Sequence, residues 1–363
     1  MHPDTPAPVT EARPGGGLPP GAMLPPLPLR SAANPRYVLD IAAGRWLLLA
    51  FLPGAGAAEA LQAALAPHRA RLDDAHAALF LITPRAEDLA EGRLRDQLPG
   101  LRALAAPEGA AFAACGFLPE RGGLLLLDPM LRVLEAAPLE SAPALLARLA
   151  ALPPPERHAG MEVPAPVLVL PRLLEPALCQ RLIALHETQG GTPSGFMREV
   201  DGRTVLVRDP AHKRRADLTI ADPALLEGLR QRLASQLVPA LRWAFQFEAT
   251  RIERYIVACY DAAEGGHFRA HRDNTTSATA HRRFAVTVNL NAGNYEGGEL
   301  CFPEFGPRTY RAPTGGAIAF SCSLLHAVRP VTRGRRYAFL PFLYDEPAAR
   351  LRERNRHRLA EAG

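Results

Sequence analysis

The first half of the chain alternates between short apolar runs and amphipathic segments. Four apolar runs predict buried strands: 45–53, 77–84, 123–129 and 132–137. Three other segments carry apolar residues at helical spacing: 57–72, 86–97 and 142–152. Pro67 lies inside the first of these and is expected to interrupt the helix, because proline removes a backbone donor. Strands that alternate with helices predict an α/β layer fold for this half.

The second half begins with helices and continues with strands. Residues 167–190 predict a strand followed by an amphipathic helix, and residues 221–245 predict a long helical stretch. Beyond residue 250, five strand-like segments are separated by glycine and proline: 251–260, 283–290, 297–303, 315–322 and 336–344. Short strands at this spacing are typical of a sandwich or jelly roll. We therefore expect supporting helices packed on a double-stranded β-helix.

Changes in composition give the expected boundaries of the two domains. Residues 1–28 are rich in proline, glycine and alanine and are expected to form a flexible tail. Residues 153–165 are proline-rich and polar, which favours a linker. The first domain is then 29–152 and the second 166–346, and residues 347–363 are expected to form a basic C-terminal tail.

Charge and cysteine content narrow the possible partners and compartments. The net charge is +5, but Lys213 is the only lysine and the arginines are interspersed with acidic residues, so we expect no nucleic-acid partner. The five cysteines form no CxxC pair, which favours reduced thiols and a cytoplasmic location. No secretory signal is visible, and the apolar runs are too short to span a bilayer, so no membrane partner is expected.

The strongest candidate for chemistry is the tripeptide His271-Arg272-Asp273. Residues i and i+2 of a strand or tight loop point to the same side, so this imidazole and carboxylate can reach one ion. His326, 55 residues later at the end of an apolar segment, can supply a third ligand. Two histidines and one carboxylate leave open positions on a six-coordinate Fe(II) ion. The pattern alone is short, and the alternative is a surface loop in which Asp273 pairs with an arginine.

Basic residues near this pattern are candidates for binding an anion. Arg336 follows His326 by ten residues, and a guanidinium one strand away can pair bidentately with a ligand carboxylate. Arg333 and Arg335 are weaker candidates and are interpreted as solvated. The basic run 212–217, HKRRAD, is predicted to be a solvated loop, with the border of a substrate entrance as the alternative.

Residues 165–345 resemble the catalytic domain of the prolyl 4-hydroxylase-like 2-oxoglutarate oxygenases. The resemblance rests on the HRD tripeptide, the GGEL turn at 297–300, the apolar segment that leads into His326, and PVTRGRRY at 330–337. It implies that His271, Asp273 and His326 bind Fe(II). It also implies that Arg336 binds the distal carboxylate of 2-oxoglutarate. Tyr260 would line the cosubstrate pocket, with Tyr255 as the alternative.

The activity implied by this resemblance is hydroxylation of a peptidyl proline or a related side chain, with release of succinate and CO2. O2 is the second cosubstrate, and ascorbate is the expected reductant of oxidised iron. The substrate itself, a protein, a peptide or a small molecule, is left open. One departure concerns the segment FAVTVNLN, where Asn289 or Asn291 stands in place of a tyrosine that contacts 2-oxoglutarate in many relatives. A binding or scaffold protein without catalysis is the alternative, against which the complete His-Asp-His-Arg set argues.

Residues 22–152 resemble, more loosely, the thioredoxin-like fold of the peroxiredoxins. At the position of that family's peroxidatic cysteine the chain has GAGAAEA at 54–60, so no thiolate is present to attack peroxide. Cys115 is the only cysteine of this domain. The resemblance therefore implies a non-catalytic domain that docks a partner or forms a homodimer, and it argues against a thiol peroxidase.

Overall fold

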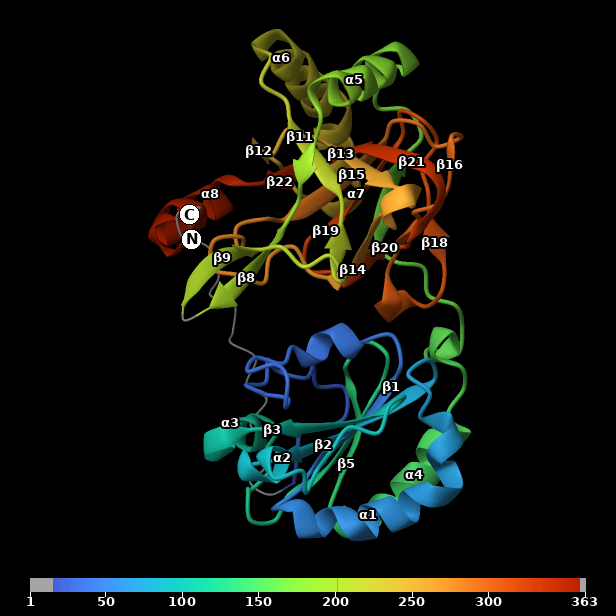
Figure 1. The fold of residues 1–363 in the computed structure, drawn as a ribbon, viewed down its shortest axis with the longest axis vertical. Helices are drawn as coiled ribbons and strands as arrows, with labels where there is room; N and C mark the ends of the chain where they lie inside the picture. The colour runs from blue at the N-terminus through green and yellow to red at the C-terminus, as the bar shows by residue number, and fades with distance from the viewer. Residues whose placement is uncertain (1–15, 201, 360–363) are drawn as a thin grey trace. The chain divides into compact units, whose positions relative to one another are not determined.

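The computed structural model describes residues 16–200 and 202–359. The chain divides into two compact units (Figure 1). The N-terminal unit comprises Met1–Pro164 and Pro303–Gly306, and the C-terminal unit comprises Ala165–Phe302 and Pro307–Gly363. Within the described residues, no helix is both long enough and apolar enough to cross a bilayer.

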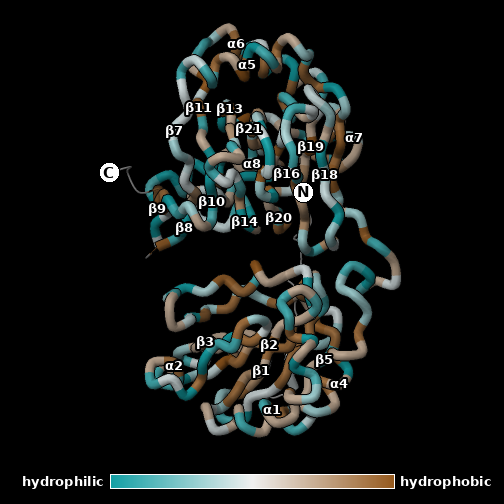
Figure 2. The backbone as a smooth tube through the Cα atoms, turned by 45° about the vertical axis from the view of Figure 1, so that its right-hand side comes forward, coloured by the Kyte–Doolittle hydropathy of each residue, from teal (hydrophilic) through white to brown (hydrophobic). Residues whose placement is uncertain are grey.

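The N-terminal unit is built on one five-stranded sheet with the order β3-β2-β1-β4-β5. Its strands are β1 (Trp46–Phe51), β2 (Ala77–Thr83), β3 (Leu101–Ala105), β4 (Gly123–Leu127) and β5 (Val133–Ala137). The first three are parallel, and β4 and β5 continue the sheet as an antiparallel pair. Every residue of β1, β2 and β4 is buried, because both faces of the sheet are covered. Figure 2 shows the resulting apolar character of β1 and β2.

Helices cover both faces of this sheet. On one face, α1 (Ala58–Leu65) and α4 (Ala142–Ala151) pack against a shared apolar core, and Figure 1 shows the two helices side by side. On the other face, α3 (Ala110–Ala114) places Phe112 against Phe51, with 5.1 Å between ring centroids. The four predicted strands and the predicted helix at 142–152 are thus confirmed.

The other predictions for this unit need correction. The predicted helix at 57–72 is α-helical only to Leu65, and a 3₁₀ segment, Ala66–Arg71, with Pro67 near its start, follows. The helix predicted at 86–97 is wrong beyond α2 (Glu87–Ala90), because the chain turns at Gly92 with φ +68°. Strand β3 was not predicted, since its five residues directly follow the Pro99-Gly100 turn.

Residues 16–28 do not behave as the predicted flexible tail. Their backbone pairs beside β5: Gly21 donates to the Val133 carbonyl at 2.7 Å, and Val133 donates back to Ala22 at 2.9 Å. Leu18 is buried. This edge offers unpaired backbone groups that the segment satisfies, despite its composition. Residues 1–15 of the predicted tail lie outside the described residues.

The C-terminal unit combines helices with two antiparallel sheets. Helices α5 (Pro176–Gln189), α6 (Pro223–Arg232) and α7 (Val238–Phe245) share an apolar core with the larger sheet, and a π-helical turn, Leu233–Leu237, joins α6 to α7. The predicted helical stretch at 221–245 is therefore present.

The larger sheet has ten strands. Seven lie on the path β12-β22-β15-β21-β13-β11-β7, with β6, β16 and β19 paired beside it. They are: β6 (Val167–Leu170), β7 (Thr192–Pro193), β11 (Ala216–Thr219), β12 (Arg251–Glu253), β13 (Ile256–Asp261), β15 (Phe284–Asn289), β16 (Tyr295–Gly297), β19 (Ala317–Ser321), β21 (Val331–Phe339) and β22 (Phe342–Tyr344).

The smaller sheet has the order β10-β14-β20-β17-β18. Its strands are: β10 (Lys213–Arg214), β14 (His267–His271), β17 (Leu300–Cys301), β18 (Thr309–Tyr310) and β20 (His326–Val328). A separate hairpin consists of β8 (Phe196–Val200) and β9 (Arg203–Val207). This antiparallel two-sheet architecture with supporting helices is the jelly-roll type of fold that the strand spacing predicted.

The predicted basic tail at 347–363 is wrong for its described part. Helix α8 (Glu346–Asn355) begins at Asp345, whose carboxylate caps the Ala348 amide at 2.9 Å. Ala348 is fully buried, and Arg352 donates to the Tyr344 hydroxyl at 3.0 Å. A capping residue followed by Pro347 starts a helix here although the composition is strongly charged. The predicted linker at 153–165 holds a short 3₁₀ turn, Pro155–Arg157, and the two units divide near its end.

Candidate metal and cosubstrate site

Three side chains of the smaller sheet converge on one point. His271 ends β14, His326 begins β20, and the two residues are directly paired in the antiparallel register. Asp273 lies two residues beyond His271, where its amide donates to the Cys322 carbonyl at 3.0 Å. The Asp273 carboxylate lies 3.6 Å from His271 Nε2 and 3.3 Å from His326 Nε2. Metal bonds of about 2.0–2.3 Å place neighbouring ligand atoms roughly 3 Å apart, so this spacing suits one ion.

The backbone fixes which nitrogen of each imidazole faces the carboxylate. His271 Nδ1 lies 2.8 Å from the Arg269 carbonyl, and His326 Nδ1 lies 3.0 Å from the Leu324 carbonyl. A carbonyl only accepts, so Nδ1 carries the proton in both rings. Each Nε2 lone pair is therefore directed towards Asp273, as a histidine ligand to a metal requires.

The protonation states also suit a divalent cation. Burial, and then the neighbouring His326, lower the pKa of His271 to about 4. Burial raises the pKa of Asp273, but His326 and His271 outweigh it and hold this pKa well below the usual value. A neutral imidazole and an ionised carboxylate are the forms that bind metals. Among the described residues, these three form the one group of histidine, cysteine or acidic side chains with the spacing of a metal site.

Arg336 supplies a buried cation on the neighbouring larger sheet. It is 2% exposed, and its Nη2 donates to Thr287 Oγ1 at 3.0 Å. Its Nε and Nη1 atoms are buried and have no hydrogen-bond partner in the described structure. An unpaired buried guanidinium is costly, whereas a carboxylate can accept two hydrogen bonds from it. These two donor atoms are therefore suited to a ligand carboxylate.

Gly298 and Tyr260 shape the space beside Arg336. A Cβ atom at Gly298 would lie 3.0 Å from Arg336 Cδ and 2.8 Å from Val331, and the φ of Gly298 is +67°, so a side chain is excluded there. Tyr260 is paired with Arg336 in the register of β13 and β21, and the guanidinium lies 5.0 Å from its ring. Tyr255 instead packs against Phe339 in the apolar core. The structure thus places Tyr260, and not Tyr255, beside Arg336.

Comparisons with known proteins agree with this geometry. Residues 255–344 match the model of the 2OG-Fe(II) oxygenase superfamily. The match lies wholly within the C-terminal unit, which is therefore similar to 2OG-Fe(II) oxygenases over these residues. Its relatives include a PKHD-type hydroxylase of Verminephrobacter eiseniae, 30% identical over 157 residues, which are 35% of this chain and 66% of the relative. A PKHD-type hydroxylase of Cupriavidus metallidurans is 34% identical over 150 residues, which are 38% of this chain and 64% of the relative.

The chain covers less than two thirds of the length of these curated relatives. Among solved structures, a Pseudomonas putida prolyl-4-hydroxylase is 20% identical with a TM-score of 0.39, covering 50% of this chain and 94% of that one. The viral collagen prolyl hydroxylase of Paramecium Bursaria Chlorella virus-1 is 18% identical with a TM-score of 0.37, covering 49% and 94%. The family match includes none of residues 1–164.

Asn289 and Asn291, which the sequence offers in place of the tyrosine of many relatives, have different environments. Asn291 is structural, because its amide donates to the Arg335 carbonyl at 2.8 Å and its oxygen accepts from the Tyr337 amide at 2.9 Å. Asn289 is buried, donates to Ala312 at 2.7 Å, and has a side-chain oxygen without a partner in the described structure. Asn289 and Thr287 are two residues apart along β15, so both side chains lie on the face towards Arg336.

Sequence reasoning missed two polar residues beside Arg336. Thr287 orients the guanidinium, as described above. Tyr295 is 3% exposed, and its hydroxyl is buried without a partner in the described structure. The Cβ position of Gly298 lies 3.5 Å from the Tyr295 ring and 3.0 Å from Arg336 Cδ, which places the tyrosine close to the cation. The only signal for Tyr295 was its position two residues before the GGEL turn.

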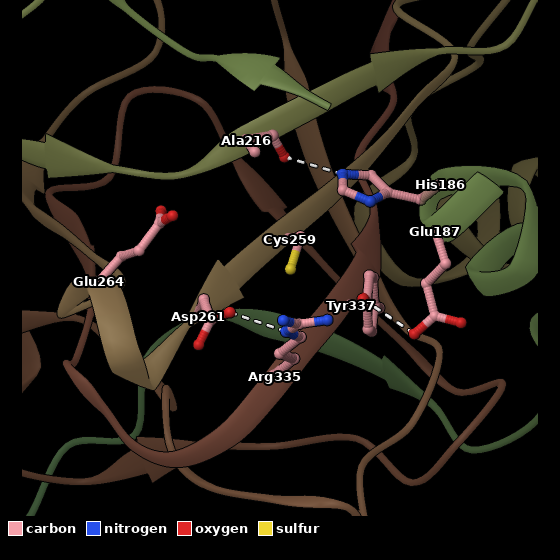
Figure 3. Close-up of a pocket in the computed structure, with 8 residues that line it drawn as sticks. All are labelled: His186, Glu187, Ala216, Cys259, Asp261, Glu264, Arg335 and Tyr337. Atoms are coloured by element: carbon pink, nitrogen blue, oxygen red, sulfur yellow. Dashed lines mark hydrogen bonds and ion pairs between the residues drawn. The ribbon is translucent and has the colours of Figure 1, made fainter. Parts of the chain in front are cut away.

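Side chains along β13 and β21 alternate between two faces of the sheet, and the face opposite Tyr260 and Arg336 borders a cavity. Tyr260 and Arg336 share one face of the sheet, and the residues next to them in sequence face the other way. A cavity of about 300 Å³ lies there, lined by His186, Glu187, Ala216, Cys259, Asp261, Glu264, Arg335 and Tyr337 (Figure 3). Arg335 pairs with Asp261 at 2.7 Å and is 58% exposed, and Arg333 is 74% exposed beside Glu296. The solvated interpretation of these two arginines is confirmed.

The basic run at 212–217 is not the solvated loop that was predicted. Lys213 and Arg215 are only 6% and 8% exposed. Lys213 begins β10 and Arg215 lies between β10 and β11, and the alternation of extended backbone turns both inward while Arg214 stays exposed. The alternative, a border of the substrate entrance, is taken up below.

Proposed function

We propose that the C-terminal unit is an Fe(II)- and 2-oxoglutarate-dependent dioxygenase that hydroxylates its substrate and releases succinate and CO2. One oxygen atom of O2 enters a substrate C–H bond, and the other enters succinate. The observation that carries the proposal is the convergence of His271, Asp273 and His326, together with a buried Arg336 that retains two donor atoms without partners. Ascorbate would serve as the reductant of oxidised iron.

Each residue of the site has a defined task in this proposal. His271, Asp273 and His326 hold the iron on one face, and the Nδ1 hydrogen bonds to Arg269 and Leu324 keep both imidazoles in the binding orientation. Iron held by these three residues would supply O2 activation and a binding position for the 2-oxo acid group of the cosubstrate. Arg336 binds the distal carboxylate, Thr287 orients Arg336, and Tyr260 bounds the pocket. Tyr295 and Asn289 offer the remaining polar contacts where relatives use a tyrosine.

We propose a peptidyl proline or a related side chain as the substrate. This rests on the resemblance of residues 165–345 to the prolyl 4-hydroxylase-like oxygenases. The relatives carry the name PKHD-type hydroxylase. A protein, a peptide or a small molecule would present this group, and neither nucleic acid nor a membrane is expected as a partner.

The deciding experiment is succinate release from 2-oxoglutarate by protein loaded with Fe(II) without oxygen and then exposed to O2. Wild type is expected to release succinate, and Asp273→Ala is expected to lose at least about 100-fold of this rate because a metal ligand is removed. Glu296→Ala, which removes a carboxylate that is 60% exposed, is the matched control and should retain the rate. Wild type that fails to bind Fe(II) contradicts the proposal. Iron binding without any turnover, with or without substrate, favours the scaffold alternative.

For the N-terminal unit we propose a thioredoxin-like, peroxiredoxin-related fold without catalysis. The support is the order of its elements: β1, α1 and β2, then the antiparallel pair β4–β5, and then α4. Cys115 is fully buried, which removes it from peroxide chemistry. Docking or homodimerisation is the proposed role, and light scattering on the full chain tests the second: a monomer at all concentrations contradicts it.

We also propose a cytoplasmic location for the protein. Its five cysteines are all free, and four of them are buried in the described structure, as expected of a chain that folds under reducing conditions.

A further inference from the structure

A group of cations lies beside the metal site in the C-terminal unit. It consists of Lys213, Arg215 and Arg254, and we call it the cation cluster. Lys213 and Arg215 are almost completely buried, and the Arg254 side chain is 28% exposed. None of the three is assigned to iron or to 2-oxoglutarate.

One carboxylate serves all three cations. Asp217 pairs with Arg215 at 2.6 Å and lies 3.9 Å from the Arg254 guanidinium. Lys213 reaches it only indirectly, because its ammonium donates to Ser194 Oγ at 2.7 Å and Ser194 donates to Asp217 at 2.5 Å. With all three cations protonated, the group carries two positive charges more than its carboxylate neutralises.

Lys213 is the least compensated member of the cluster. Its ammonium has three donors, and the two acceptors in the described structure, Ser194 Oγ and the Gly195 carbonyl at 2.6 Å, are both neutral. A buried charge with neutral partners is unfavourable, and an anion would relieve the cost. The pKa of Lys213 reflects this, since burial and then Arg215 lower it to about 6. A bound anion would raise this pKa again.

The cluster lies close to the reacting centre. The Lys213 ammonium sits 4.7 Å from the centre of the Phe268 ring, and that ring stacks on His271 with 3.5 Å between centroids. Arg215 donates to the Tyr260 hydroxyl at 3.2 Å. The negative charge of Asp273 favours the protonated forms of both Lys213 and Arg254 and so acts to raise the pKa of each. The cations therefore border the space between the metal ligands and Tyr260.

We propose that the cation cluster binds a carboxylate of the primary substrate. This inference rests on the proposed function and names its substrate class: a molecule with a carboxylate near the carbon that is hydroxylated. The carboxylate can belong to a free acid, such as an amino acid, or to an acidic residue or C-terminus of a peptide. The distal carboxylate of 2-oxoglutarate is a separate ligand, since Arg336 already provides its donors.

The first test measures binding without catalysis. Thermal unfolding of the full chain is followed with sodium acetate, acetamide or inorganic phosphate at constant ionic strength. Acetate is expected to raise the Tm of wild type by at least about 1 °C more than acetamide, because it binds only the folded protein. Lys213→Met should lose this difference and Lys213→Arg should keep it. Arg214→Met is the matched control: the adjacent residue of β10 is exposed, and its loss should have no effect.

The second test compares substrates in matched pairs by stimulated succinate release. One pair is L-proline and L-prolinamide, and the other is two proline-containing peptides that differ only by Asp or Asn beside the proline. The carboxylate member of at least one pair should have a KM at least about tenfold lower with wild type. Lys213→Met should reduce this preference below twofold without changing the KM for 2-oxoglutarate. The pair that responds distinguishes a free acid from a peptide.

Several outcomes overturn the inference. They are equal stabilisation by acetate and acetamide, an acetate effect that survives Lys213→Met, or stabilisation by phosphate in place of acetate. If Lys213→Met does not fold, Arg254→Gln is expected to show the same loss, and an unchanged acetate effect in that variant contradicts the proposal. Succinate release without added substrate, together with no preference for acetate, rejects the substrate class but leaves the dioxygenase intact. A clear acetate preference without iron binding rejects the dioxygenase instead.

Discussion

The two units differ most in the side chains that they bury. In residues 16–164, the buried polar side chains are Thr83 and Asp88, and they satisfy each other through a hydrogen bond of 2.7 Å. In the C-terminal unit, seven basic or histidine side chains are buried among the described residues: His186, Lys213, Arg215, His281, Arg282, His326 and Arg336. Both units have a continuous apolar core, so neither needs these groups for its hydrophobic stabilisation.

This difference indicates which unit performs chemistry. Burying an ionisable group costs free energy unless it is paired, so a fold retains several of them mainly where they have a task. Some pairs are structural, as when Glu253 binds His281 and Arg282. Arg336 and Lys213 are different, because each keeps a donor that the described chain does not satisfy. Among the described residues of 16–164, the one buried side-chain nitrogen or oxygen without a partner is Nε2 of His76, and no arginine or lysine there is buried in this way.

The largest expected effect comes from a core change in the N-terminal unit. Leu48 in β1 is fully buried, with 0% of its surface exposed to solvent. Leu48→Ala should lower the free energy of unfolding of this unit by about 2–5 kcal/mol, because it leaves a cavity in the core. Urea unfolding followed by tryptophan fluorescence reports on it, because Trp46 is buried at 2% exposure whereas Trp243 is 92% exposed.

If the comparison holds, Leu48→Ala leaves succinate release within about twofold of wild type at a temperature where both units are folded. The matched change Leu229→Ala, at an equally buried position of α6, should instead impair release. A loss of release in Leu48→Ala as large as that in Leu229→Ala would show that the N-terminal unit contributes to catalysis.

The second effect tests the unpaired guanidinium of the C-terminal unit. Arg336→Met should raise the KM for 2-oxoglutarate about 100-fold, equivalent to roughly 2–3 kcal/mol, because a carboxylate then loses a charged partner in a buried site. Arg335→Met changes the adjacent residue, which faces the opposite side of β21, and should leave this KM unchanged. Equal KM values for wild type and Arg336→Met would contradict the assignment. Fe(II) affinity should be the same in all three proteins.

The third effect is a pH dependence of stability that arises from Glu253, which binds His281 and Arg282. Burial raises the pKa of Glu253, but the His281 hydrogen bond and Arg282 outweigh it and lower this pKa to about 2. Below about pH 4.3, the ordinary value, the unfolded chain binds a proton that the folded one does not. The stabilisation by Glu253 is thus complete above that pH and is lost as the pH falls towards 2.

Urea unfolding followed by circular dichroism should show a loss of about 1–3 kcal/mol from this residue between pH 5 and pH 2.5. The quantity to compare is the difference between wild type and Glu253→Gln, which removes the contributions of other carboxylates. This difference should shrink as the pH falls. A difference that stays constant would mean that Glu253 is not ionised in the folded protein.

The sequence allowed most of the site to be predicted because its parts are local patterns. The spacing of His271 and Asp273 reflects strand geometry, and His326 and Arg336 lie on apolar strands whose period is visible. Lys213 was misjudged because its run of charges suggests solvent, and only the alternation of a two-residue strand turns it inward. Thr287 and Tyr295 were missed because their proximity to Arg336 arises from pairing between distant strands.

The fold was predictable where periodicity is strong and failed where tertiary contacts decide. The buried strands β1, β2 and β4 are continuous apolar runs and were recognised. Residues 16–28 have the composition of a tail, yet they pair beside β5. Helix α8 was expected to be a tail since charge dominates its composition, although Asp345 and Pro347 form a helix start. Composition describes a segment by itself and contains no information about the edge that it covers.

The smallest expected effect concerns Cys115 of the N-terminal unit. Burial raises its pKa to about 12, so very little of the thiol is ionised at pH 8, and the thiolate is the reactive form. Iodoacetamide at pH 8, followed by mass spectrometry, should label Cys115 at least about 100-fold more slowly in the native protein than in urea. Cys115→Ala should change neither succinate release nor the rate of peroxide consumption, which should match the background without protein. Rapid native labelling of Cys115, or peroxide consumption that Cys115→Ala abolishes, would give the N-terminal unit a reactive group and remove the contrast between the two units.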